Sequence, residues 1–197
     1  MGVAWVFETE LNKTAVERIL ESNGADYAGT FSVDSIPYVP TEKHQLEIAC
    51  NYILHHSNFP QTTFSIAAAD TYKRSPRAIC DRGFDLILGK MRNGCSPDQL
   101  GKFEVKGSEY TLNDFTIRVG NATQVSAFKG VIVEVEYRAS SVVSQCRELL
   151  VEFMRTLFMS SSEQRPDAIE QGNPENYSPI DTMWQYLTIF RTLRKKT

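Results

Sequence analysis

The sequence has neither an excess of positive charge nor a long apolar run. Its 197 residues include 21 Lys and Arg against 24 Asp and Glu, which gives a formal net charge of −3. Because a protein that binds nucleic acid through phosphates needs a basic face, we expect no direct nucleic-acid partner. Without a run of about 18 or more apolar residues we expect no transmembrane helix and no membrane partner. The opening residues MGVAWVFETELNK lack the pattern of a secretory signal.

Local motifs for catalysis and ligand binding are missing as well. The sequence contains no GxxxxGKS/T or GxGxxG loop and no GxSxG elbow. The four cysteines form no CxxC pair, and the adjacent His55 and His56 would point to opposite faces of a strand. His44 is the only other histidine, so the histidines and cysteines do not form a zinc ligand set. We expect no catalytic residue, no metal and no cofactor.

The composition that remains is that of an ordinary globular domain. Hydrophobic residues make up 42% of the chain and charged residues 23%. A chain of this length can bury one full-sized core, so residues 1–197 are predicted to form a single domain.

The first half of the chain is predicted to consist of short strands and two helices. Residues 3–7 are typical of a strand, and Asn12 is placed to cap a helix that Gly24 would end. Alternation from Tyr27 predicts a strand that the prolines of SIPYVP would end. LEIACNYIL, TTFSIAAAD and RAICD predict three more strands, with SNFP as a turn between the first two. A helix is predicted over residues 84–94.

The second half is predicted to begin with an antiparallel meander over residues 102–138. Its segments KFEVKG, EYTLNDFTIRVG and KGVIVEVEYR are separated by the turn signals Gly107-Ser108, Gly120-Asn121 and Lys129-Gly130. A helix over residues 141–159 follows, and then an exposed loop over residues 160–178 that is poor in apolar residues. Ser178, Pro179 and Asp181 predict a capping box that opens a last helix.

These elements predict an α+β fold that is mainly β. Antiparallel strands must hide their edges, so we expect an antiparallel β-barrel of about eight strands. A few helices, including two at the C-terminal end, would pack on it.

The last helix is apolar over more of its circumference than one core requires. Such a helix either lies between two elements of its own domain or is covered by a partner, and the pattern does not choose between these. If a partner covers it, the interface residues would be Met183, Trp184, Tyr186, Leu187 and Phe190.

The segment EVEYR at residues 134–138 is the strongest catalytic candidate. In a strand Glu134, Glu136 and Arg138 point the same way, so they could hold a divalent metal and a phosphate. The segment resembles the ExExK motif of the triphosphate tunnel metalloenzymes, with Arg in place of Lys. The alternative is a solvent face whose glutamates pair with lysines across the strands.

Six segments, taken in order, resemble one family over most of the chain. They are MGVAWV at the start, GTFSVDSIPY at 29–38, GFDLILGKMR at 83–92, KFEVKGSEYTLNDFTIRVG at 102–120, VIVEVEYRASSVVSQCRELLVEFM at 131–154 and YSPIDTMWQYLTIFRTLRK at 177–195. The chain is identified by them as a member of the Mediator subunit 20 family, also called the TRF-proximal protein family.

The resemblance implies a non-catalytic scaffold in the nucleus. Members of this family form an antiparallel barrel that pairs with Mediator subunit 18, and subunit 8 tethers the pair to the Mediator head module. The head module contacts RNA polymerase II and the TATA-binding protein, which makes both indirect partners. The alternative function is a metal-dependent triphosphate tunnel phosphohydrolase that uses Glu134, Glu136 and Arg138.

Overall fold

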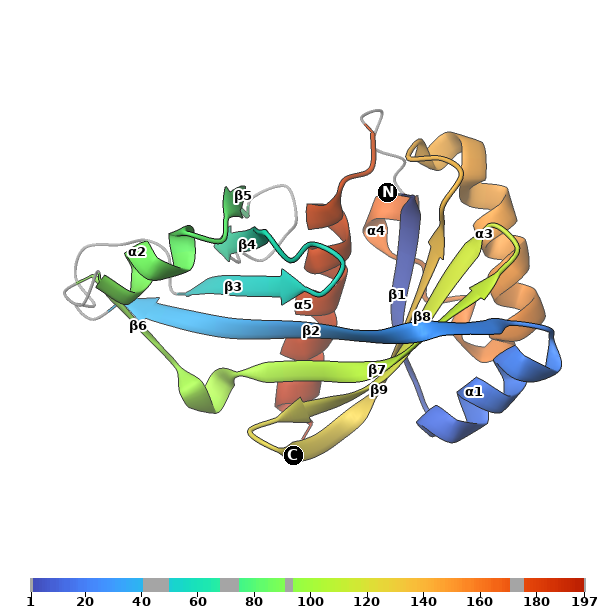
Figure 1. The fold of residues 1–197 in the computed structure, drawn as a ribbon, viewed down its shortest axis with the longest axis horizontal. Coiled ribbons are helices and arrows are strands. Elements are labelled where there is room, and N and C mark those ends of the chain that lie inside the picture. The colour runs from blue at the N-terminus through green and yellow to red at the C-terminus, as the bar shows by residue number, and fades with distance from the viewer. Residues whose placement is uncertain (1, 41–49, 68–74, 91–93, 171–175, 197) are drawn as a thin grey trace. The chain divides into compact units, whose positions relative to one another are not determined.

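The computed structural model of the chain describes five stretches, which form two compact units (Figure 1). The described residues are 2–40, 50–67, 75–90, 94–170 and 176–196. The first unit consists of Met1–Phe31, Lys106–Ala122 and Lys129–Thr197, and the second of Ser32–Val105 and Thr123–Phe128. Four strands contribute residues to both units, so this division does not correspond to two separate domains joined by a linker. The expectation of one domain stays a prediction.

Nine strands and five α-helices make up the described fold. The strands are β1 (Val3–Thr9), β2 (Asp26–Pro40), β3 (Asn51–His56), β4 (Thr62–Ala67), β5 (Arg77–Asp81), β6 (Cys95–Pro97), β7 (Phe103–Leu112), β8 (Phe115–Gln124) and β9 (Ala127–Tyr137). The helices are α1 (Lys13–Ser22), α2 (Phe84–Lys90), α3 (Val143–Leu157), α4 (Asp167–Glu170) and α5 (Pro179–Lys195). Within the described ranges, no helix has the length and apolar character needed to cross a membrane.

The strands belong to one antiparallel sheet. Its order is β1-β9-β8-β7-β2-β3-β4-β5, and β6 pairs with β2. The pairs β1–β9, β2–β3, β3–β4 and β4–β5 are antiparallel. The predicted fold class, mainly β with antiparallel strands and packed helices, is therefore confirmed. Over the described residues this order has two ends, β1 and β5, so the sheet is open where the sequence predicted a closed barrel.

The two predicted helix starts have the expected caps. Asn12 Oδ1 accepts a hydrogen bond from the backbone N–H of Ala15 at 2.8 Å, and Gly24 follows α1 with a φ of 82°. At α5, the carboxylate of Asp181 accepts from the backbone N–H of Ser178 at 2.8 Å and from its hydroxyl at 2.9 Å. Both arrangements satisfy donors that a helix start leaves unpaired.

The turns of the meander lie where the sequence did not place them. Gly107, Gly120 and Gly130 are inside β7, β8 and β9, and the hairpin turns fall at Asn113-Asp114 and Val125-Ser126. Gly107 is needed for close backbone approach, because a Cβ there would lie 1.8 Å from the carbonyl oxygen of Val119. The three predicted turn positions are therefore wrong, and the turn at Asn113-Asp114 divides the predicted strand EYTLNDFTIRVG between β7 and β8. Only the number of strands in the meander, three, is confirmed.

In the second unit, the elements begin and end at other residues than the sequence predicts. Strand β2 continues through Pro37, which pairs with Tyr52 of β3, so the prolines do not end it. Strand β3 begins at Asn51, and the predicted strand positions Leu46 and Ile48 lie outside the described residues. The helix predicted over residues 84–94 is α2, which ends at Lys90, and residues 91–93 lie outside the described part.

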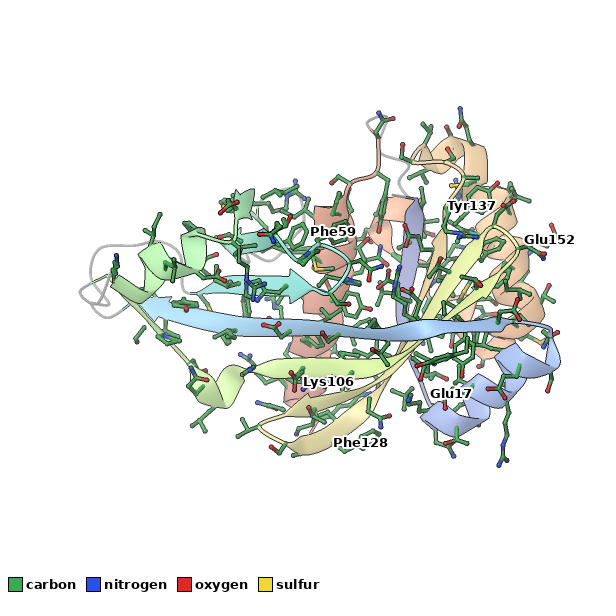
Figure 2. The ribbon with its side chains drawn as sticks, in the orientation of Figure 1. Glu17, Phe59, Lys106, Phe128, Tyr137 and Glu152 are labelled. Carbon is green, nitrogen blue, oxygen red and sulfur yellow. The ribbon has the colours of Figure 1, made fainter. Side chains whose placement is uncertain are left out.

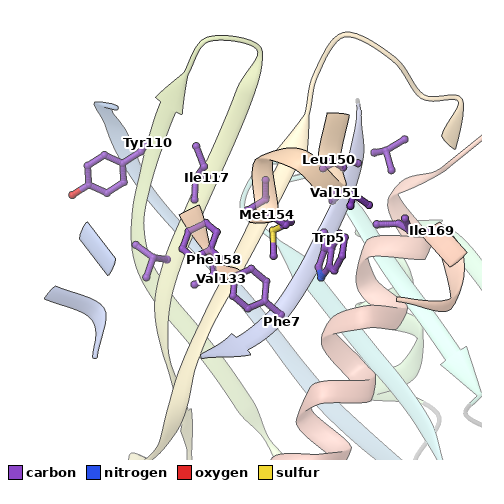
Figure 3. Packing of buried hydrophobic residues seen from close by; sticks show 14 of the residues in the cluster. Trp5, Phe7, Tyr110, Ile117, Val133, Leu150, Val151, Met154, Phe158 and Ile169 are labelled. Carbon is purple, nitrogen blue, oxygen red and sulfur yellow. The ribbon is translucent and has the colours of Figure 1, made fainter. Parts of the chain in front are cut away.

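The first unit has a core in which α1, α3 and α4 contribute to the same apolar cluster as the strands. Figure 3 shows Trp5 and Phe7 of β1 close to Met154 of α3 and to Phe158. The rings of Phe7 and Phe158 meet edge to face with centroids 5.2 Å apart. Burial of each such side chain contributes about 1.5–3 kcal/mol before the entropy of folding is counted.

The segment predicted as an exposed loop over residues 160–178 is only partly exposed. Ile169 of α4 and Tyr177 belong to the buried core cluster, and Ser161 and Ser162 are also buried. The few apolar side chains of this polar segment pack on the core, which composition averaged over the segment does not reveal. Residues 171–175 lie outside the described part.

Candidate functional site

Strand β9 carries apolar side chains on one face and carboxylates on the other. Val131, Val133 and Val135 belong to the core cluster of the first unit. Glu134 and Glu136 alternate with them, because successive side chains of a strand point to opposite faces. The two carboxylates therefore point the same way, as the sequence predicts.

An arginine of the neighbouring strand binds both carboxylates. Arg118 of β8 donates from Nη1 to Glu134 Oε1 at 2.5 Å and to Glu136 Oε2 at 2.9 Å. Its Nε donates to Glu109 Oε2 of β7 at 2.6 Å. We call these four residues, all within the first unit, the Arg118 cluster.

Two further donors complete the bonding of the glutamates. The hydroxyl of Tyr186 in α5 donates to Glu134 Oε2 at 2.7 Å, and the backbone N–H of Gly2 donates to Glu136 Oε1 at 2.9 Å. Every carboxylate oxygen of Glu134 and Glu136 thus accepts a hydrogen bond from the chain itself. Buried carboxylates are tolerated only with such partners.

The electrostatics of the cluster keep its donors protonated. Burial alone would lower the pKa of Arg118, but the carboxylates of Glu134, Glu136 and Glu109 outweigh burial and hold that pKa above its usual value. Burial, and then the carboxylate of Glu134, raises the pKa of Tyr186 well above 10. Arg118 therefore stays charged and Tyr186 stays a donor at physiological pH.

The third residue of the predicted catalytic site lies apart from the other two. Arg138 is exposed, and its Nη2 donates to the carbonyl oxygen of Asn113 at 2.7 Å. The structure brings Glu134 and Glu136 together but pairs them with Arg118 instead. In the part of the chain that the structure describes, no group of three His, Cys, Asp or Glu side chains is arranged to hold a metal.

Helix α5 buries most of the predicted partner interface within the chain. Met183, Tyr186, Leu187 and Phe190 are all buried, and Trp184 is half-buried. Of the two alternatives for this helix, the geometry favours packing between elements of its own chain for those four side chains. A partner could reach only Trp184 of the five without a movement of the helix.

A glutamine of α5 pairs with the backbone of β1 as a neighbouring strand would. The backbone N–H of Val6 donates to Gln185 Oε1 at 2.7 Å, and Gln185 Nε2 donates to the carbonyl oxygen of Ala4 at 2.9 Å. The hydroxyl of Tyr177 donates to the same carbonyl at 3.1 Å. Because β1 is a terminal strand of the sheet order, these contacts satisfy backbone groups that would otherwise be unpaired.

Sequence reasoning missed Arg118 and Gln185. Arg118 alternates with the buried Ile117 and Val119, and that pattern could have indicated a charged side chain on the opposite face of a strand. Nothing local pairs it with Glu134, because that contact depends on the register of β8 against β9. Gln185 gave no signal, since a polar residue in an apolar helix is usually exposed.

The second unit contains a separate polar cluster around His55. His55 Nδ1 lies 3.0 Å from Asp34 Oδ2 and its Nε2 lies 3.1 Å from Asp85 Oδ2 of α2. The hydroxyl of Thr63 donates to Asp85 Oδ1 at 2.9 Å, and Arg82 Nε lies 3.2 Å from Asp85 Oδ2. A histidine between two carboxylates favours the doubly protonated ring. His44, the histidine considered with it, lies outside the described residues.

Comparison with known proteins places this chain beside one group of relatives. The family model described as "TATA-binding related factor (TRF) of subunit 20 of Mediator complex" matches residues 1–191. A Mediator of RNA polymerase II transcription subunit 20 of Caenorhabditis briggsae is 50% identical over 199 residues, covering 100% of both chains. The Homo sapiens protein of the same name is 32% identical over 183 residues, covering 91% of this chain and 84% of the relative.

Solved structures with a similar trace are more distant. A protein of Pyrococcus horikoshii matches with a TM-score of 0.49 and 14% identity, covering 80% of this chain and 90% of the other. A chain of the Schizosaccharomyces pombe Mediator head module matches with a TM-score of 0.43 and 16% identity, covering 80% of this chain and 92% of the other.

Proposed function

Because the chain belongs to the Mediator subunit 20 family, we propose that it is a non-catalytic structural subunit of the Mediator complex. The observation that carries the proposal is the match along the whole chain to a relative of that name at 50% identity.

The finer proposal concerns its place in the complex. The protein acts in the head module, where it pairs with Mediator subunit 18, and subunit 8 tethers the pair. Through the head module it supports transcription initiation by RNA polymerase II in the nucleus, near the TATA-binding protein. The family resemblance of the sequence motivates each of these statements.

The chemistry of the Arg118 cluster supports a structural role over a catalytic one. The two glutamates that could have held a metal are already bonded through all four of their oxygens. Arg138, which would complete a tunnel motif, donates to a turn carbonyl. The alternative of a triphosphate tunnel phosphohydrolase would need Arg118 and Tyr186 to move away from Glu134.

The experiment is purification of the tagged full chain from nuclear extract at high salt, with quantitative mass spectrometry of what is bound. High salt screens weak charge contacts, so a packed interface should persist. We expect the Mediator head subunits, with subunit 18 in a one-to-one ratio. Recovery of Mediator without stoichiometric subunit 18 would contradict the pairing, and recovery of the chain alone would contradict the whole proposal.

A further inference from the structure

Helix α2 is attached to the sheet of the second unit through few side chains. Of its seven residues, all of them described, Leu88 alone is buried, while Leu86 and Ile87 are 71% and 55% exposed. A helix of this length is not stable by itself in water, so contacts with the sheet must hold it. Its polar contacts with the sheet come from the side chain of Asp85.

The carboxylate of Asp85 reaches two side chains of the sheet. It lies 3.1 Å from His55 Nε2 of β3, and it accepts from the hydroxyl of Thr63 of β4 at 2.9 Å. Its third partner, Arg82, is three residues earlier in the same segment and does not tie the helix to the sheet. On the other side of the ring, His55 Nδ1 lies 3.0 Å from Asp34 Oδ2 of β2. One imidazole therefore joins a carboxylate of the sheet to a carboxylate of the helix.

The protonation of this imidazole decides whether both contacts can be hydrogen bonds. A charged ring donates from both nitrogens, whereas a neutral ring donates from one and carries a lone pair on the other. Loss of the proton therefore sets a lone pair against one of the two carboxylates. Asp34 and His55 are directly opposite each other in the β2–β3 ladder, so the backbone keeps that pair together. Asp85 lies outside any ladder, so its contact is the one that breaks.

The charged groups that act on His55 are two carboxylates and one guanidinium. Burial lowers the pKa of His55, but the hydrogen bond to Asp34 and the charges of Asp34 and Asp85 together raise it above the usual 6.5, against the opposing charge of Arg82. A raised pKa in the attached state means that attachment is favoured at low pH and weakens as pH rises through that pKa.

Among the described residues, tyrosine and cysteine supply the other titratable groups near this cluster. Burial, and then the negative charges that Asp85 and Cys95 can carry, raise the pKa of Tyr38 of β2 above 10. Tyr38 therefore stays neutral where a histidine titrates. Cys80 of β5 is opposite Thr63 in the β4–β5 ladder and so shares its face of the sheet.

We propose that α2 is a proton-controlled flap, which the charged imidazole of His55 holds on the sheet and the neutral imidazole releases while the strands beneath stay paired. Strands β3 and β4 keep their own ladder, from Asn51 opposite Ala67 to Leu54 opposite Phe64, so the release does not require them to separate. Release would uncover Leu88 beside the exposed Leu86 and Ile87. The inference does not depend on the proposed function.

The test is hydrogen exchange of the full chain between about pH 5.5 and 8.5, on both sides of the usual pKa of histidine. Mass spectrometry gives the exchange of peptides from α2 and from β3 and β4. Each rate is expressed as protection relative to an unstructured chain at the same pH, because exchange itself is catalysed by base.

We expect α2 to be protected at the lowest pH, but less than β3 and β4 at every pH, because it opens by itself. Its protection should fall as pH rises, by at most tenfold per pH unit, since one proton is released. Deprotonation destabilises the whole fold as well, so the difference between α2 and the strands is what shows a separate opening. Equal protection of both, or protection of α2 that is absent or does not change with pH, would overturn the proposal.

Two variants assign the effect to this cluster. In His55→Gln the side chain is neutral at every pH, so the protection of α2 should be low and independent of pH. In Asp85→Asn the amide can accept from a ring nitrogen or donate to it, so the dependence on pH should also disappear. A dependence that survived in both variants would overturn the proposal.

The matched control is His56→Gln, which changes the neighbouring histidine on the opposite face of β3. His56 Nδ1 accepts from the backbone N–H of Asn58 at 3.0 Å. Its ring meets that of Phe59, labelled in Figure 2, edge to face with centroids 5.7 Å apart. Because His56 does not contact Asp85, this control should keep the dependence of α2 on pH.

Discussion

At the scale of single residues, glycine in this sheet has a different role from the one its sequence context indicates. Gly107-Ser108 has the composition of a turn, yet Gly107 lies inside β7 against the backbone of β8. Glycine serves both turns and close backbone approaches, because both depend on the missing Cβ. Local sequence cannot separate these uses.

Replacement of Gly107 by alanine should destabilise the protein strongly. The added Cβ would meet the carbonyl oxygen of Val119 at 1.8 Å and the Cα of Gly120 at 2.5 Å, and backbone atoms on both sides leave little room to relax. We expect a loss of about 3 kcal/mol in the free energy of unfolding, measured by urea denaturation.

The matched control is Gly89→Ala in helix α2. An added Cβ there meets nothing within 4 Å, and alanine is the better helix former. A gain of about 0.5–1 kcal/mol is expected. Equal effects of the two substitutions would show that the approach of β7 to β8 is looser than described.

Val125 and Ser126 form a real turn, although their sequence has none of the residues that usually indicate a two-residue hairpin turn. Both residues have positive φ, and neither is glycine or asparagine. Relief of this strain by Asn-Gly should raise the free energy of unfolding by about 1 kcal/mol. Urea denaturation measures this gain, and an unchanged free energy of unfolding would show that the turn stores no such strain.

At the scale of elements, helix α2 is joined to its sheet through a titratable side chain. Burial alone would lower the pKa of His55, but its hydrogen bond to Asp34 and the charges of Asp34 and Asp85 raise it, against an opposing effect of Arg82. The net pKa lies above the usual 6.5. The charged imidazole can donate to a carboxylate of β2 and to one of α2 at the same time.

Stability should therefore fall as pH rises through the titration of His55. A pKa that is higher in the folded state gives stability that is fully present below about pH 6.5 and lost as pH rises through the folded pKa. His55→Gln should flatten this part of the dependence of unfolding free energy on pH. The pKa itself can be measured by following the imidazole resonances in NMR.

The controls for this prediction are Asp34→Asn and Asp85→Asn. Each removes one carboxylate from the ring, so each should lower the pKa of His55. An unchanged pKa in both variants would contradict the assignment of the shift to these contacts.

Helix α5 shows why an over-wide apolar helix does not by itself identify an interface. Its apolar side chains are buried within the chain, and Gln185 hydrogen-bonds to the backbone of the terminal strand β1. Of the five predicted interface residues, the one that stays accessible is Trp184, so the role of this helix in binding a partner remains a prediction centred on that side chain.

At the scale of the whole molecule, the guanidinium of Arg118 in β8 joins β8 to carboxylates of β7 and β9, and Glu134 extends the network to α5 through the hydroxyl of Tyr186. Arg118→Met would leave Glu134 buried without its cation, and we expect a loss of about 3–5 kcal/mol in the free energy of unfolding. The loss should shrink at acidic pH, because Glu134 can then bind a proton.

The double variant Arg118→Met with Glu134→Gln tests the cause of that loss. A neutral amide removes the unpaired charge, so the double variant should be more stable than Arg118→Met alone. Thermal unfolding of Arg118→Met, Glu134→Gln and the double variant measures the three losses of stability. If the loss in the double variant equals the sum of the two single losses, Arg118 and Glu134 contribute independently.

The sequence by itself determined the features that depend on a few neighbouring residues. The alternation of β9, the caps of α1 and α5, and the antiparallel class follow from periods of two and 3.6 and from local donors. The family also follows from the sequence alone, because the resemblance of whole segments can be found without coordinates.

Only the tertiary structure decided which side chains meet. It paired Glu134 and Glu136 with Arg118 instead of Arg138, placed His55 between Asp34 and Asp85, and assigned Gln185 to the terminal strand. These contacts join residues from 16 to 181 positions apart in the chain. Such pairings depend on the register of strands and on how helices pack, and local backbone geometry does not fix either of these.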